Sequence, residues 1–131
     1  MAQSIRMQHD ADPVKKLLAE LGNIDDVEVF HNQVMVATYV RPERTAGGII
    51  LTEKNRDEDK FQGKVGLIVK MGPDACNDPS GKWYNGITVK LHDWIIYRPS
   101  DGWPLTIDKV TCRMLEDVVI KGRISRPDRV W

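Results

Sequence analysis

The feature that most restricts the fold of this chain is a series of short segments in which apolar residues recur at every second position. The clearest begins at Val34, where Val34, Val36, Thr38 and Val40 alternate with Met35, Ala37 and Tyr39. Further strands are expected at 63–71, at 88–97 with an interruption at 92–93, and near 105–107, 111–115 and 118–120. Segments in which apolar residues alternate in this way, and which are bounded by turns rich in glycine and proline, are typical of strands. The pattern predicts an all-β barrel or sandwich.

The pattern also predicts two details of these strands. In the segment 63–71, the residues expected on one face are Val65, Leu67, Val69 and Met71. Between the strands near 105–107 and 111–115, Asp108 and Lys109 are expected to form the turn.

One short helix is predicted before the first strand. Asp12 can cap its N-terminus, Pro13 suits its first position, and Gly22 ends it. Its apolar residues lie at helical spacing: Val14, Leu17, Leu18 and Leu21. So short a helix is not stable alone and must dock on the strands. We therefore expect an arm and helix at 1–25, a barrel at 26–122 and a polar tail at 123–131.

Composition excludes several classes of protein. The chain has 131 residues, enough for one domain, with 19 Lys and Arg against 19 Asp and Glu. A nucleic-acid-binding surface would need a basic surplus. Cys76 and Cys112 lie in no C-x-x-C pattern, which favours reduced, intracellular thiols. No apolar run approaches the roughly 20 residues of a membrane span, and the N-terminus is no secretory signal. A cytoplasmic protein without nucleic-acid or membrane partners is expected.

The connection at 41–62 is too long for an ordinary hairpin, and long connections are usually functional. Charged residues occupy both of its ends. Its middle holds a glycine pair followed by three aliphatic residues: Gly47, Gly48, Ile49, Ile50 and Leu51. Three exposed aliphatic residues favour aggregation unless another protein buries them. The alternative is a further core strand entered through the glycine pair.

Five motifs in this order resemble those of the GroES-type co-chaperonins. They are residues 30–36 (FHNQVMV), 45–51 (TAGGIIL), 63–65 continuing to 71–73, 89–95 (VKLHDWI) and 115–118 (LEDV). The resemblance implies a small GroES-like β-barrel with a long mobile hairpin loop. It also implies a homo-oligomer, a seven-membered ring that caps a chaperonin ring, with residues 47–51 as the anchor. The partner would hydrolyse ATP, so no catalytic residue, cofactor or metal is expected in this chain.

Some residues depart from the family pattern. Asn32 and Gln33 replace an Asp-Arg pair, and His92 stands where the family has glycine, so the turn there must avoid positive φ or become strained. The extensions at both ends resemble those on proteins encoded by tailed bacteriophages, several of which carry their own co-chaperonin, so a bacteriophage-encoded member of the family is expected. They also suggest an alternative function, a head decoration or connector protein of a virion. Its loop and arms would then bind neighbouring capsid or tail proteins.

Aromatic residues in turns form a second group of candidates. Trp83, Tyr84 and Trp103 are candidates for contact with another subunit or partner, and so is Trp131 at the C-terminus. The alternative is ordinary packing at the ends of the barrel, whereas Trp94 fits a core strand position. The histidines have no ligand-like spacing with the cysteines. Neither a catalytic triad nor a phosphate-binding loop is evident, so an enzyme is not expected.

Overall fold

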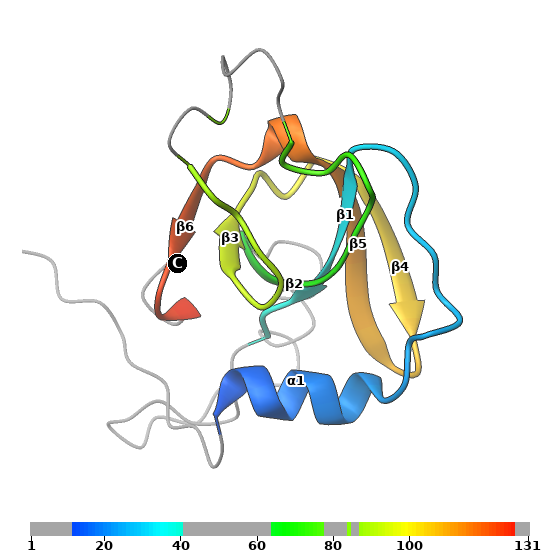
Figure 1. The fold of residues 1–131 in the computed structure, drawn as a ribbon. Coiled ribbons are helices and arrows are strands. Elements are labelled where there is room, and N and C mark those ends of the chain that lie inside the picture. The colour runs from blue at the N-terminus through cyan, green and yellow to red at the C-terminus, as the bar shows by residue number, and fades with distance from the viewer. Residues whose placement is uncertain (1–11, 41–63, 78–83, 85–86, 128–131) are drawn as a thin grey trace, which may run out of the picture.

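The computed structural model of the chain describes residues 12–40, 64–77, 84 and 87–127. In this part, the strands form one curled antiparallel sheet, accompanied by one α-helix and one short 3-10 helix (Figure 1). The expected fold class, all-β with a single short N-terminal helix, is confirmed. The long connection lies outside the described residues.

The strand order is β4-β5-β1-β2-β3-β6, so β1 and β2 lie at the centre of the sheet. The strands are β1 (Gln33–Thr38), β2 (Val65–Met71), β3 (Trp94–Ile96), β4 (Trp103–Ile107), β5 (Val110–Glu116) and β6 (Gly122–Ile124). Within the described residues, β4 and β6 are the two edges. The 3-10 helix η1 (Asp117–Val119) connects β5 to β6.

Helix α1 (Pro13–Leu21) begins and ends where the sequence predicts. The Asp12 carboxylate accepts a hydrogen bond from the Val14 N–H at 2.9 Å, and Pro13 occupies the first turn. At the other end, Gly22 has a φ of 69° and donates its N–H to the Leu18 oxygen at 3.0 Å. Positive φ at this position ends the helix because glycine adopts it without steric cost.

The sheet buries apolar residues on both faces. One face carries α1 and is called here the helix-side core; its buried members include Leu21, Met35, Ala37, Tyr39, Val65, Leu67, Trp94 and Cys112. The other face, the opposite core, includes Val34, Val36, Ile68, Ile95, Tyr97 and Leu115. Because successive side chains of a strand point to opposite faces, β1 must be apolar at odd and even positions alike.

A bulge in the β1–β2 pairing corrects one prediction. Val36 pairs with Ile68, whereas Met35 pairs with Lys70, so β2 has one extra residue at this point. The extra residue reverses the alternation. Met71 therefore pairs with Val34 and packs against the opposite core, away from Val65.

Two predicted strands were wrong in part. The strand predicted at 88–97 is reduced to Trp94–Ile96, because 90–93 form a turn in which the Asp93 carboxylate accepts from the Lys90 N–H at 3.1 Å. His92 reaches a φ of 70° there, so it does not avoid the left-handed region. The strand predicted near 118–120 is instead mostly η1, and β6 forms just after it, on β3.

The turn of the β4–β5 hairpin is formed by the two residues that the sequence predicts. Asp108 and Lys109 both have positive φ, 46° and 73°, as expected for the two-residue turns that match strand twist. The strand before them begins earlier than predicted, at Trp103, and includes Pro104. Proline is tolerated because β4 is an edge strand and needs no donor on its free side.

Candidate partner-binding site

The predicted anchor lies outside the described residues. Its members are Gly47, Gly48, Ile49, Ile50 and Leu51. The structure does describe the chain on both sides of this segment, up to Val40 and again from Lys64. We call Tyr39 and Val40 the first root of segment 41–63, and Lys64 and Val65 its second root.

Main-chain hydrogen bonds hold the roots in place. The Tyr39 N–H donates to the Val65 oxygen at 3.0 Å, which joins the two roots directly. The Tyr97 N–H donates to the Lys64 oxygen at 3.0 Å, which joins the second root to the residue after β3. The chain therefore leaves and re-enters the sheet at a fixed, hydrogen-bonded position.

Gly66 permits close packing directly beside the roots. A Cβ added there would lie 2.9 Å from Cβ of Val36 and 3.1 Å from Cε1 of Tyr97. These are distances at which any side chain would displace its neighbours. Glycine at this position lets β1, β2 and the Tyr97 ring pack together beneath the roots.

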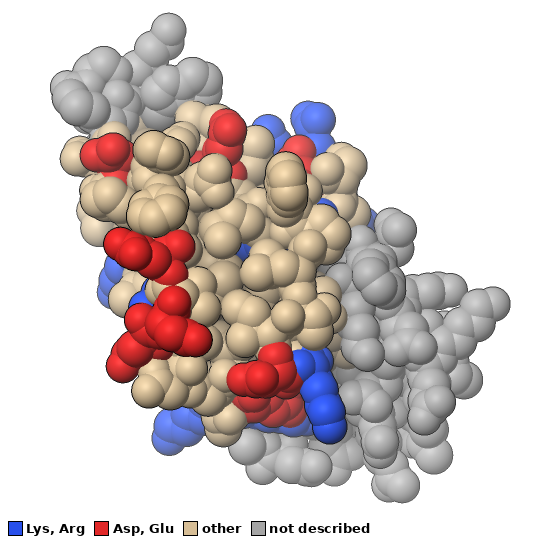
Figure 2. All heavy atoms as spheres, turned by 90° about the vertical axis from the view of Figure 1, so that its right-hand side faces the viewer, with Lys and Arg blue, Asp and Glu red and all other residues tan. Residues whose placement is uncertain are grey.

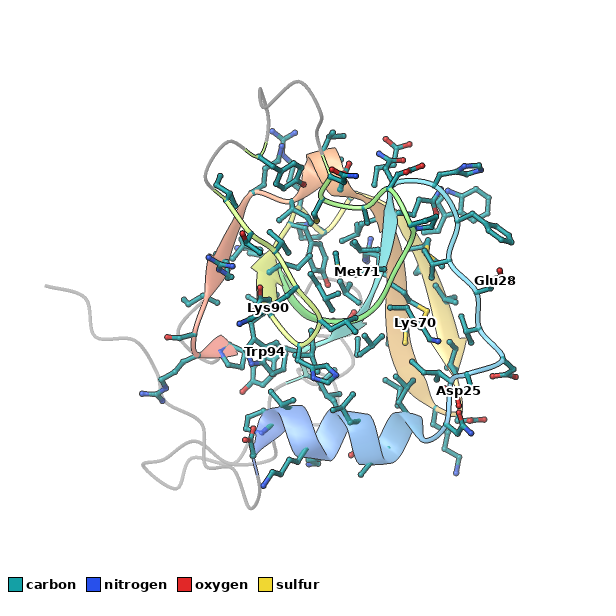
Figure 3. The ribbon with its side chains drawn as sticks, viewed as in Figure 1. Asp25, Glu28, Lys70, Met71, Lys90 and Trp94 are labelled. Atoms are coloured by element: carbon teal, nitrogen blue, oxygen red, sulfur yellow. The ribbon has the colours of Figure 1, made fainter. Side chains whose placement is uncertain are left out.

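An aromatic pair supports the first root from the helix-side core. Tyr39 and Trp94 pack edge to face, with ring centroids 5.8 Å apart and planes at 84°. Both are almost completely buried. Figure 3 shows Trp94 beside the N-terminal half of α1. The prediction that Trp94 occupies a core strand position is confirmed.

Asp117 joins several turns at the end of the sheet that carries η1. Its side chain is buried, and its carboxylate accepts from Asn32 Nδ2 at 2.8 Å and from the Cys76 N–H at 2.9 Å. Its main-chain oxygen accepts from the Tyr84 hydroxyl at 2.6 Å. The amide of Asn32 is a donor that a carboxylate at this position could not supply. The sequence alone shows that Asn32 departs from the family pattern, but it does not predict that Asp117 is the hydrogen-bond partner of Asn32.

Burial favours the neutral forms of the thiol and the phenol beside Asp117. Burial raises the pKa of the Cys76 thiol, against the opposing effect of its hydrogen bond with Tyr84. Burial also raises the pKa of Tyr84 well above its usual range. A nucleophilic cysteine needs a lowered pKa, and these shifts have the opposite sign. What the hydrogen bonds of this cluster do is join turns that are distant in the sequence.

Arg113 shapes the turn that precedes β4. Its buried guanidinium donates from Nη1 to the main-chain oxygens of Pro99 and Asp101, both at 2.7 Å. It also lies over the Tyr97 ring, 5.8 Å from the centroid. Its Nε has no partner in the described part of the chain. Carbonyl oxygens and an aromatic face thus solvate this cation, which fixes the backbone just before Trp103.

Trp103 is the most exposed of the large apolar residues that the structure describes, at 79%. It borders a hollow whose other lining residues are Gln33, Gly102, Pro104, Leu105, Met114, Glu116 and Val119. Figure 2 shows the side of the molecule that carries β4, where uncharged residues cover the middle and acidic residues gather along one margin. An exposed tryptophan on an edge strand is typical of a contact surface.

The other aromatic candidates are placed differently. Tyr84 is half-buried and its hydroxyl is bound to Asp117. Trp83 and Trp131 lie outside the described residues. Of the four predicted interface residues, the structure thus places Tyr84 and Trp103, and the interface role of all four stays a prediction.

Two negative findings concern the described residues alone. They contain no group of three or more His, Cys, Asp or Glu side chains that could hold a metal ion. None of their helices combines the length and the apolar character needed to cross a membrane.

In the described part of the chain, a six-stranded antiparallel sheet with one short α-helix defines a small all-β protein. The family model described as "Chaperonin 10 Kd subunit" matches residues 26–124. The protein named Co-chaperonin GroES from Methylorubrum populi is 30% identical over 95 residues, which cover 72% of this chain and 93% of that protein. The chain belongs to the GroES-type co-chaperonin family.

Proposed function

We propose that copies of this chain assemble into a ring that caps a chaperonin ring in the cytoplasm and assists ATP-dependent protein folding. The observation that carries the proposal is the family match over residues 26–124, which includes every strand described above. The relative named as a co-chaperonin supports the same role.

The contact with the partner is assigned to Ile49, Ile50 and Leu51, with Gly47 and Gly48 permitting the turn before them. Burial of each aliphatic side chain contributes about 1.5–3 kcal/mol. Ordering the segment on binding offsets a few kcal/mol of this gain. One copy therefore binds weakly, whereas several copies in one ring bind orders of magnitude more tightly. Such a lid binds firmly and still dissociates in each ATP cycle.

ATP hydrolysis belongs to the partner in this proposal. In the described part of the chain, the hydrogen bonds of Cys76 and Tyr84 to Asp117 join turns of the backbone. The alternative role in a virion rests on the two extensions alone, and no feature of the fold or of the family match favours it.

The first test mixes the purified chain with a bacterial chaperonin and ATP or ADP, and measures capture of the chain on the chaperonin by sedimentation. Nucleotide-dependent capture is expected. The variant Ile50→Asp is expected to lose capture, because a carboxylate cannot be buried in an apolar groove without a large cost. Its circular dichroism spectrum should match that of the unaltered chain.

The matched control also replaces an aliphatic residue by aspartate, but at a position outside the proposed anchor. Leu91 is an exposed aliphatic residue in the turn before β3. Leu91→Asp should leave capture unchanged. Equal capture of the Ile50→Asp variant and the unaltered chain would overturn the anchor assignment.

A further inference from the structure

A second apolar hollow, distinct from the one beside Trp103, borders the edge strand β6. Its lining includes aliphatic and basic residues: Ile87, Val89, Val118, Ile120, Lys121 and Arg123. Ile87 and Val118 are 52% and 43% exposed. Exposed apolar residues that lie together mark contact surfaces of proteins. We call Ile87, Val118, Lys121 and Arg123 the basic surface.

The exposed charges that line this second hollow are both positive. Lys121 is exposed. The Arg123 side chain is 48% exposed, although its Nη1 also donates to the Asp93 carboxylate at 3.1 Å. Asp117 lines the same hollow, but its carboxylate is buried and accepts the two hydrogen bonds described above. A partner of the basic surface therefore meets cations beside aliphatic side chains.

The hollow beside Trp103 has the opposite charge. We call four of its lining residues the tryptophan surface: Trp103, Leu105, Met114 and Glu116. Glu116 is exposed and is the one charged residue among the described residues that line this hollow. Asp25 and Glu28, also exposed, lie on the side of the molecule that carries β4 (Figure 3), where Figure 2 shows acidic residues along one margin. The tryptophan surface therefore combines an apolar centre with an acidic margin.

The two surfaces border the two edge strands of the described sheet. These strands, β4 and β6, lie on opposite sides of the molecule (Figure 1). Because one surface is acidic and the other basic, each attracts the other and repels a copy of itself. Contacts between two different surfaces of identical chains join them head to tail, and such contacts close into rings when the rotation between copies permits.

Pro104 indicates that side chains, and not an added strand, make the contact on the β4 side. Proline has no N–H, so it weakens a free strand edge as a template for pairing with another strand. Trp103 lies directly before it and presents a large exposed side chain. Tryptophan is enriched among the residues that contribute most of the binding energy of interfaces. The tryptophan surface thus offers an aromatic anchor to its partner.

We propose that copies of this chain meet head to tail, with Trp103 of one copy packed against Ile87 and Val118 of the next. The acidic margin of the tryptophan surface then lies beside Lys121 and Arg123. This inference rests on the proposed co-chaperonin function and names the surfaces through which the copies of its ring meet. Neither surface includes a residue of segment 41–63, so the contact between copies and the contact with the chaperonin involve different residues.

The test uses two variants of the full chain, Trp103→Ala and Val118→Asp, each of which alters one surface and leaves the other intact. Assembly is measured by sedimentation velocity over a range of concentrations. Alone, each variant should need at least about tenfold more chain for half-maximal assembly. An equimolar mixture should form heterodimers and stop there, because the intact tryptophan surface of one variant binds the intact basic surface of the other.

The charge of the basic surface has its own test. Lys121→Glu should weaken assembly about fivefold at low salt and less at high salt, because salt screens opposite charges. Its matched control is Lys15→Glu, at an exposed lysine of α1. Leu91→Asp, at an exposed aliphatic residue outside both hollows, is the control for Val118→Asp. Both controls should assemble like the unaltered chain.

Two results would refute the head-to-tail contact: variants that assemble like their controls, or a mixture of Trp103→Ala and Val118→Asp that yields no heterodimer. Capture of the unaltered chain by the chaperonin would then leave the co-chaperonin function intact. An unaltered chain that assembles but is not captured would instead contradict the co-chaperonin function alone.

Discussion

Replacing Asp117 by alanine should strongly destabilise the sheet, although the residue lies in a short 3-10 helix. The carboxylate accepts hydrogen bonds from Asn32 Nδ2 and from the Cys76 N–H, at 2.8 and 2.9 Å. A hydrogen bond to a charged group contributes about 1.5–3 kcal/mol. Removing both is partly offset because a buried carboxylate no longer has to be desolvated. We expect a loss of about 3 kcal/mol in the free energy of unfolding for Asp117→Ala.

Replacing Asp117 by asparagine separates the effect of the side chain's volume on stability from the effect of its charge. Asp117→Asn keeps one acceptor oxygen but places an NH₂ group against either the Cys76 N–H or the Asn32 amide, so two donors face each other. The expected loss is about 2 kcal/mol. The bond from the Tyr84 hydroxyl to the main-chain oxygen survives both changes. Tyr84→Phe should therefore cost a separate amount of about 1 kcal/mol.

The assay is urea unfolding at one fixed protein concentration, followed by tryptophan fluorescence and circular dichroism, because assembly would make stability depend on concentration. Asp26→Ala, at an exposed aspartate, is the control and should change the free energy of unfolding by less than about 0.5 kcal/mol. A double-mutant cycle with Asn32→Ala isolates the Asn32–Asp117 pair. If Asp117→Ala is as stable as the Asp26→Ala control, the carboxylate does not hold these turns and the reasoning is refuted.

Three further predictions concern a thiol, a glycine and a tryptophan. Burial raises the pKa of Cys112 to about 11 from its usual value near 9. The unfolded thiol therefore ionises first, stability falls as the pH rises from 9 to 11, and Cys112→Ala should flatten this dependence in pH-dependent unfolding. A Cβ added at Gly72 would collide with the main-chain oxygens of His31 and Phe30, so Gly72→Ala should lower the unfolding free energy by about 1–3 kcal/mol; an unchanged urea midpoint would contradict this. Trp103→Ala should leave the monomer's unfolding free energy within about 0.5 kcal/mol. It should reduce assembly measured by analytical ultracentrifugation, and unchanged assembly would remove Trp103 from the interface.

The sequence by itself determined the ends of those elements that are set by interactions between residues close together in the chain. The α1 boundaries follow from Asp12, Pro13 and Gly22, and the β4–β5 turn follows from Asp108 and Lys109. In each case the decisive interaction is within a few residues along the chain, so it can be read without the fold. The alternation around Val36 likewise predicted the central strand, and the order of motifs predicted the family.

Other features depend on partners distant in the sequence. The bulge that turns Met71 to the opposite core arises where β1 meets β2, and periodicity within β2 alone cannot reveal it. The predicted strand near 118–120 became a 3-10 helix where Asp117 binds Asn32 and Cys76, which are 85 and 41 residues away.

The same division applies to the site. The sequence alone identified a long connection with an aliphatic centre, because its composition differs from that of its flanks. Only the tertiary structure placed Tyr39 and Val65 in one buried cluster with Leu21, since this grouping arises from packing and not from any local pattern. Hydrophobic packing is non-directional, so a sequence predicts which residues are buried more readily than which of them touch.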